Sequence, residues 1–149
     1  MAEESATLQG TLIDLAEGGT EVVLRTMDGQ SQRGAIRLVA GDFVVLTSDG
    51  GDTWVATSGI DSVRPSSNER HGAATGDRSA VDMILGDALG RVVPERPPVA
   101  VRTTGGESVV GALRAVGSDV LTLELDGAGR PVCYVSLASV LAVAFLRSG

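Results

Sequence analysis

The sequence predicts a mainly β protein made of two tandem five-stranded bent barrels, each preceded by a short α-helix. Two observations indicate this fold. Residues 24–46 and 101–123, aligned at a shift of 77 without a gap, are identical at ten of 23 positions. Short apolar runs separated by Gly- and Asp-containing turns then recur in the same order in both copies. Such an internal repeat of short strands is typical of small antiparallel sheets used twice.

The first unit is expected over residues 1–65. Apolar residues at helical spacing predict a helix over 6–17, which Gly18-Gly19 ends. A barrel over 20–65 follows, because Val- and Leu-rich runs alternate with turn residues. Its strands are expected over 21–26, 33–39, 43–47, 53–57 and 61–64.

The second unit is expected over residues 79–149. An apolar helical face predicts a helix over 79–91, and a barrel follows over 98–146. Its strands are expected over 99–104, 109–116, 120–125, 131–136 and 140–145. Between the units, residues 66–78 offer a core almost nothing to bury and predict a flexible linker.

Two turns distinguish the copies. The first hairpin carries Asp28-Gly29, which predicts a tight turn of the primed type with positive φ at both central positions. The second unit has Gly105-Gly106 there. A later loop is three residues longer in the second unit, so the shift becomes 80 beyond it and Trp54 aligns with Tyr134.

Composition excludes several classes of protein. The net charge of −7 argues against bulk attraction to nucleic acid or to an anionic membrane. A single cysteine excludes an intrachain disulfide and suits a reducing compartment. We find no signal peptide and no apolar run long enough for a membrane span, so we expect a cytoplasmic protein. The basic residues are all Arg, which is typical of a GC-rich genome such as that of an actinobacterium.

The turn pattern resembles that of the Sm/LSm superfamily, the SH3-like small barrels that include Hfq. Each unit has an apolar first strand, then Gly-x4-Gly, then an apolar residue two positions later, and then a Val-turn-Asp-apolar step. The residues that carry this pattern are Gly29, Gly34, Ile36 and VAGDF in the first unit, and Gly106, Gly111, Leu113 and VGSDV in the second. The resemblance implies bent five-stranded barrels whose edges pair between subunits.

The RNA-binding residues of that family are missing from both units. The places of the family's Asp and Asn hold Ala40 and Val44 in the first unit, and Gly117 and Leu121 in the second. The Arg-Gly pair of the second family motif is also absent. Recognition of a splayed RNA base needs polar groups and a stacking surface at such places. The fold is therefore expected without the family's RNA pocket.

Four arginines are the main repeated polar feature: Arg25, Arg37, Arg102 and Arg114. Strand alternation places them opposite the apolar side chains, on an outer face. They are candidates for contact with an anion or RNA. The alternative, which we favour, is cross-strand pairing with carboxylates such as Glu21 or a solvated face.

The aligned aromatics and aspartates have structural interpretations as well as functional ones. Trp54 and Tyr134 could stack on a base, but packing in a core or an interface is the favoured interpretation. Asp42 and Asp119 begin the third strands and are expected to hold their own turns.

Nothing in the sequence indicates catalysis, and we expect no enzyme, no cofactor and no metal. The single histidine, His71, lies in the expected linker, and Cys133 is expected to be buried, so a nucleophilic pair has no support. No His and Cys cluster has metal-ligand spacing.

The strand edges motivate the functional expectation. A strongly bent barrel leaves its last two strands with unpaired backbone groups, and two units in one chain can pair one such edge internally. The apolar run VLAVAFL at 140–146 indicates an interface strand. We expect a non-enzymatic assembly or protein-interaction module that self-associates or adds a protein partner through its edges. The alternatives are an Hfq-like RNA-binding regulator that uses the arginine face, which we do not favour, and a ligand sensor in the cleft between the barrels.

Overall fold

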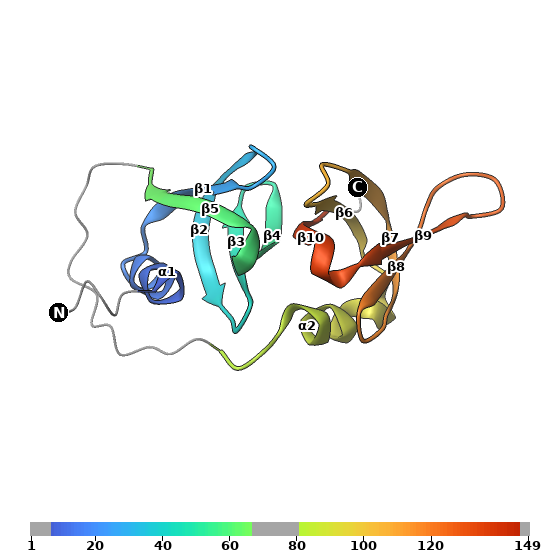
Figure 1. The fold of residues 1–149 in the computed structure, drawn as a ribbon, viewed down its shortest axis with the longest axis horizontal. Helices are drawn as coiled ribbons and strands as arrows, with labels where there is room; N and C mark the ends of the chain where they lie inside the picture. The colour runs from blue at the N-terminus through green and yellow to red at the C-terminus, as the bar shows by residue number, and fades with distance from the viewer. Residues whose placement is uncertain (1–6, 67–80, 147–149) are drawn as a thin grey trace.

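The computed structural model describes residues 7–66 and 81–146. The mainly β class is confirmed: ten antiparallel strands form one open sheet, accompanied by two short α-helices (Figure 1). The strands occur in two groups of five, each after one helix. We call residues 7–66 the first unit and residues 81–146 the second unit.

The first unit contains one α-helix, five strands and one short 3-10 helix. These elements are α1 (Leu8–Glu17), β1 (Glu21–Thr26), β2 (Ser31–Val39), β3 (Phe43–Ser48), β4 (Gly51–Ala56), η1 (Thr57–Gly59) and β5 (Ile60–Pro65). The second unit has the same order, with an extra 3-10 turn after its helix. Its elements are α2 (Leu85–Val92), η2 (Val93–Glu95), β6 (Pro98–Thr103), β7 (Ser108–Val116), β8 (Val120–Glu124), β9 (Val132–Ser136), η3 (Leu137–Ser139) and β10 (Val140–Phe145).

One strand pair joins the two units. The sheet order is β5-β1-β2-β3-β4-β10-β6-β7-β8-β9, so each unit contributes its fifth, first, second, third and fourth strands in that order. The joint is the antiparallel pair of β4 and β10. The two units therefore pair one strand edge with another inside the chain, and the apolar strand β10 lies at this joint.

The hydrophobic cores cross this joint. One cluster surrounds Leu12 of α1 and the apolar side chains of β1 to β5, and it includes Ala142 from β10. The other surrounds Leu89 of α2 and the strands of the second unit, and it includes Ala40, Phe43 and Val45 from the first. Each unit thus contributes apolar side chains to the core of the other. The apolar surface buried in this way stabilises the joined arrangement.

The second helix begins later than the sequence predicted. A helix over 79–91 was expected, but α2 starts at Leu85, and residues 81–84 are not helical. These residues bind the first unit instead: Val81 forms a parallel bridge with Ala40, and the Gly41 N–H donates to the Met83 carbonyl at 2.9 Å. A contact with a distant turn therefore outweighs the local helical pattern. Residues 79–80, and the expected linker 66–78 apart from its first residue, lie outside the described residues.

The first hairpin turn also differs from the prediction. The Gly29 N–H donates to the Thr26 carbonyl at 2.9 Å, and φ is positive at Gly29 but not at Asp28. This is a type I turn followed by a left-handed glycine, which suits a loop longer than two residues. The second unit repeats it with positive φ at Gly106. Within the described ranges, no helix has the length and apolar character needed to cross a bilayer.

Candidate interaction surface

The joint between the units contains paired backbone and an aromatic cluster. Thr53, Trp54 and Val55 on β4 pair with Ala144, Val143 and Ala142 on β10, respectively. The Trp54 ring lies 5.3 Å from Phe43 of its own unit and 4.7 Å from Phe145 of the other, centroid to centroid. Tilted rings at these spacings contribute beyond their buried area. Trp54 therefore packs between the two other aromatic rings of this cluster.

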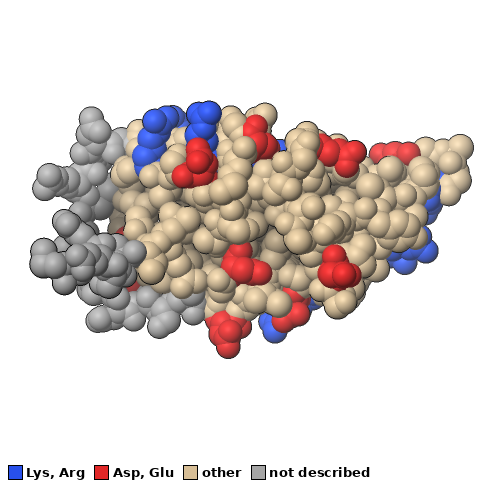
Figure 2. All heavy atoms as spheres, in the orientation of Figure 1, with Lys and Arg blue, Asp and Glu red and all other residues tan. Residues whose placement is uncertain are grey.

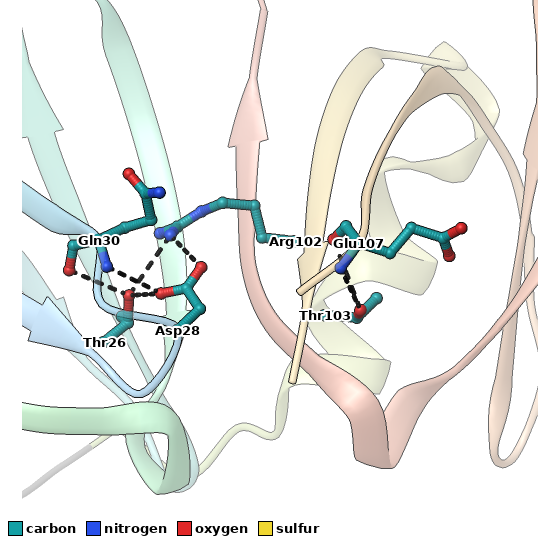
Figure 3. A network of polar contacts seen from close by, with 6 residues as sticks. All are labelled: Thr26, Asp28, Gln30, Arg102, Thr103 and Glu107. Atoms are coloured by element: carbon teal, nitrogen blue, oxygen red, sulfur yellow. Dashed lines mark hydrogen bonds and ion pairs between the residues drawn. The ribbon is translucent and has the colours of Figure 1, made fainter. Parts of the chain in front are cut away.

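An ion pair crosses the same joint. The Arg102 guanidinium extends from the end of β6 to the turn between β1 and β2, where its Nη1 lies 2.6 Å from Asp28 Oδ2 (Figure 3). Only 18% of the Arg102 side chain and 9% of the Asp28 side chain are exposed. The other Asp28 oxygen accepts hydrogen bonds from the Thr26 hydroxyl and, at 3.2 Å, from the Gln30 N–H. Both carboxylate oxygens are thus occupied.

These contacts determine the ionisation of Asp28. Burial on its own would raise the pKa of this carboxyl group. The hydrogen bonds from Thr26 and Gln30, together with the charge and hydrogen bond of Arg102, outweigh burial and lower the pKa from its ordinary value of 3.8. Asp28 therefore stays charged under neutral conditions and holds Arg102 in place. The remaining terminal nitrogen of Arg102, Nη2, is buried with no hydrogen-bond partner among the described residues.

A glycine permits close approach elsewhere in the joint. Gly59, in η1 of the first unit, is buried against Leu141 of β10. A Cβ atom at this position would overlap the Leu141 Cδ2 atom. Leu141 is itself fully buried, so it has little room to move aside. The second unit has Ser139 at the position that aligns with Gly59.

The four repeated arginines have different surroundings. Arg37 Nη2 lies 3.1 Å from Asp52 Oδ2 on an exposed face. Arg25 lies 3.8 Å from Asp61, rather than pairing with Glu21 as considered from sequence. Arg114 is exposed and has no ion pair within the described part of the chain.

Arg102 is less exposed than the other three because it reaches a carboxylate on the other unit, which the sequence pattern does not reveal. On the face shown in Figure 2, the basic side chains lie at the margins, and acidic side chains lie both in the middle and along the upper and lower margins.

The outer edges of the sheet contrast with the joint. Among the described residues, β5 pairs only with β1, and β9 pairs only with β8. Tyr134 on β9, the counterpart of Trp54, is 70% exposed. Cys133 beside it is half-buried, not buried as expected, and His71 lies outside the described residues. The edge at β9 is therefore an uncovered counterpart of the edge that β4 uses in the joint.

A groove of about 880 Å³ runs between the units beside α2. Turns of both units line it, and its polar side chains include Asp42, Thr57, Asp87 and Arg91. The Thr57 hydroxyl is buried and has no hydrogen-bond partner among the described residues. No group of three or more His, Cys, Asp or Glu side chains in the described part of the chain is arranged to hold a metal ion.

Sequence reasoning missed the role of Asp42. From the turn before β3, its Oδ1 accepts a hydrogen bond from the Leu85 N–H at 2.7 Å, so Asp42 caps the helix of the other unit. One signal in the sequence could have indicated this role. Ile84, the residue before α2, has no side-chain acceptor, so the N-terminus of α2 needs an acceptor from another part of the chain.

No protein-family model matches the chain, and no curated protein is similar to it. The functional proposal therefore rests on the fold and on the contacts of the joint.

Proposed function

We propose that this chain is a non-enzymatic assembly module, made of two tandem Sm-like barrels, that associates with further copies of itself through β5 and β9. One observation carries the proposal: β4 of the first unit pairs with β10 of the second, while the counterparts of these two strands remain at the outer edges. An unpaired strand edge presents backbone donors and acceptors that favour addition of another strand.

The repeat alignment gives the register of the proposed contact. At a shift of 80, β9 corresponds to β4, and β5 corresponds to β10. Transferring the register of the joint then places three residues of β9 opposite three residues of β5 in the next copy. The pairs are Cys133 with Arg64, Tyr134 with Val63, and Val135 with Ser62.

This contact joins two different surfaces, so each copy keeps one edge of each kind. Such a head-to-tail interface produces a closed ring or an open chain, depending on the rotation between copies. The shared sheet order of the two units supports repeated use of one interface. The same order, with the turn pattern of both units, supports the Sm-like assignment.

The contact between copies should be weaker than the internal joint. Gly105 stands where the first unit has Asp28, so the counterpart of the buried ion pair is missing. Asp61 corresponds to the buried Leu141, and Pro65 corresponds to Phe145. Because this surface is more polar and lacks part of the aromatic cluster, association should depend on protein concentration.

RNA binding through the arginines has less support. Arg25, Arg37 and Arg102 each lie near a carboxylate, which lowers their availability to phosphate. The net charge of −7 opposes bulk attraction to nucleic acid.

Sedimentation equilibrium over a range of protein concentrations tests the proposal. We expect the mass to rise from the 15.2 kDa of one chain to multiples of it. Tyr134→Lys should raise the dissociation constant about tenfold, because a lysine at an edge opposes strand pairing. Val110→Lys is the matched control, since Val110 is an exposed apolar residue on the inner strand β7. A protein that stays monomeric at every concentration would overturn the proposal.

A further inference from the structure

The internal joint holds the start of a helix as well as a strand edge. Asp42, in the turn between β2 and β3 of the first unit, caps α2 of the second by accepting from the Leu85 N–H at 2.7 Å. Leu85 is the first residue of α2, and 5% of it is exposed. A carboxylate at this place accepts a hydrogen bond from an otherwise unpaired N–H group, and its negative charge interacts favourably with the positive end of the helix dipole.

Both members of this contact have counterparts that face solvent. At a shift of 77, Asp42 corresponds to Asp119 and Leu85 corresponds to Leu8, which is the first residue of α1. The Asp119 side chain is exposed, and its carboxylate accepts no hydrogen bond from any described residue. Leu8 is 37% exposed, against 5% for Leu85. The counterparts of the two residues that meet inside the chain thus lie apart and exposed, one in each unit.

The two helices occupy equivalent places in their units. Leu12 of α1 and Leu89 of α2 correspond at the same shift, and both are completely buried in the cores of their own units. Gln9 of α1 donates to the Ala40 carbonyl at 3.1 Å, which places the start of α1 beside its own β2–β3 turn. The start of α2 lies beside the corresponding β7–β8 turn, since Gly86 and Gly117 line the same groove.

From this equivalence we propose that Asp119 of one copy caps α1 of the next copy by accepting from the Leu8 N–H. The inference rests on the proposed self-association and names a contact within it. The cap that α1 already has is compatible with this contact, because the Thr7 hydroxyl accepts from the Gly10 N–H and leaves the Leu8 N–H to another acceptor. The same docking covers the exposed Leu8 side chain, as the joint covers Leu85.

The face of the second unit around Asp119 fits such a neighbour. Phe43 and Val45 are buried by the second unit, and their counterparts Val120 and Thr122 are only half-buried. This uncovered face is continuous with the edge of β9, because Val120 and Thr122 pair with Ser136 and Tyr134. A second copy that pairs with β9 in the register of the joint would therefore cover this face and bring its α1 to Asp119.

The test compares two charge-equivalent variants by sedimentation equilibrium. Asp119→Ala should raise the dissociation constant for self-association about fivefold, which is the effect of losing one helix cap. Asp126→Ala removes the same charge from an exposed residue of the β8–β9 loop and should leave the constant within about twofold. Both variants, when dilute, should unfold at the temperature of the unaltered protein.

Hydrogen exchange at the Leu8 amide, measured by NMR, gives a direct readout of the cap. Exchange of this amide should slow as the unaltered protein associates, and should slow less in Asp119→Ala at an equal degree of association. If the unaltered protein associates and Asp119→Ala behaves like Asp126→Ala, the cap is wrong and the assembly proposal stands. If the unaltered protein remains monomeric, both are wrong.

Discussion

Arg102 Nη1 lies 2.6 Å from Asp28 Oδ2, in an ion pair that joins the two copies of a duplicated unit. The two residues come from opposite sides of the joint, and neither is more than one-fifth exposed. Their counterparts, Arg25 and Gly105, cannot form the same pair. This ion pair is therefore specific to the joint inside the chain.

Loss of Arg102 should destabilise the chain more than loss of an exposed arginine. Arg102→Ala leaves the Asp28 carboxylate buried without its charge partner, so we expect the free energy of unfolding to fall by about 3 kcal/mol. Arg37→Ala removes an exposed pair and should cost about 0.5 kcal/mol. Urea unfolding of both variants measures the difference, and equal losses would show that the cross-unit pair carries no special stability.

The stability contribution of Asp28 should depend on pH in a defined direction. Its folded-state pKa lies below its ordinary value of 3.8. The contribution is therefore complete above the unfolded-state pKa and decreases as the pH falls through the folded-state pKa. We compare the unaltered protein with Asp28→Asn: their difference in free energy of unfolding should be constant above about pH 5 and shrink in more acidic solution. A difference that grows on acidification would contradict the assignment.

Gly59→Ala should destabilise the joint through Leu141. The added methyl group overlaps the Leu141 side chain, and overpacking of a buried site costs about 1–3 kcal/mol. Leu141→Ala creates space at the cost of a cavity. The double variant should therefore lose less unfolding free energy than the two single variants lose together. A double-mutant cycle of unfolding free energies measures this difference. Simple additivity would mean that the two side chains do not compete for space.

A charged residue at position 105 should strengthen self-association. Gly105 has room for a side chain and does not adopt positive φ, so aspartate can take the place that Asp28 has in the first unit. Gly105→Asp then offers a carboxylate to Arg25 of the next copy, and we expect association about threefold tighter. Adding Arg25→Ala should abolish the gain in sedimentation equilibrium. A gain that survives Arg25→Ala would exclude this ion pair as its cause.

Local patterns predicted the strands closely. β1, β3 and β7 lie within a residue or so of their expected ranges, because alternating apolar residues and turn glycines are signals contained in the strands themselves. The predicted start of the second helix, residue 79, was too early because residues 81–84 contact a turn some forty positions away in the sequence. Propensity does not include such a contact.

The contacts of the joint were harder to predict. Burial of Arg102 depends on Asp28, which is 74 positions away in the sequence. Capping of α2 at Leu85 depends on Asp42, which is 43 positions away. The repeat alignment matches Arg102 with Arg25, but the Arg102 side chain is mostly buried and the Arg25 side chain is exposed. Equivalent positions in a duplicated chain are equivalent in fold, but one lies at a joint and the other at an edge.

The most direct test of the central claim is a disulfide between copies. The natural Cys133 on β9 should lie opposite position 64 on β5 of the next copy, at a separation that a disulfide can span. Arg64→Cys should therefore cross-link under mild oxidation into dimers and longer ladders, and the ladders should disappear when Cys133→Ser is added. Ser62→Cys lies two residues away on the same face of β5 and should cross-link poorly. Ladders of equal yield from both cysteines, or none from Arg64→Cys, would contradict the head-to-tail pairing of β9 with β5.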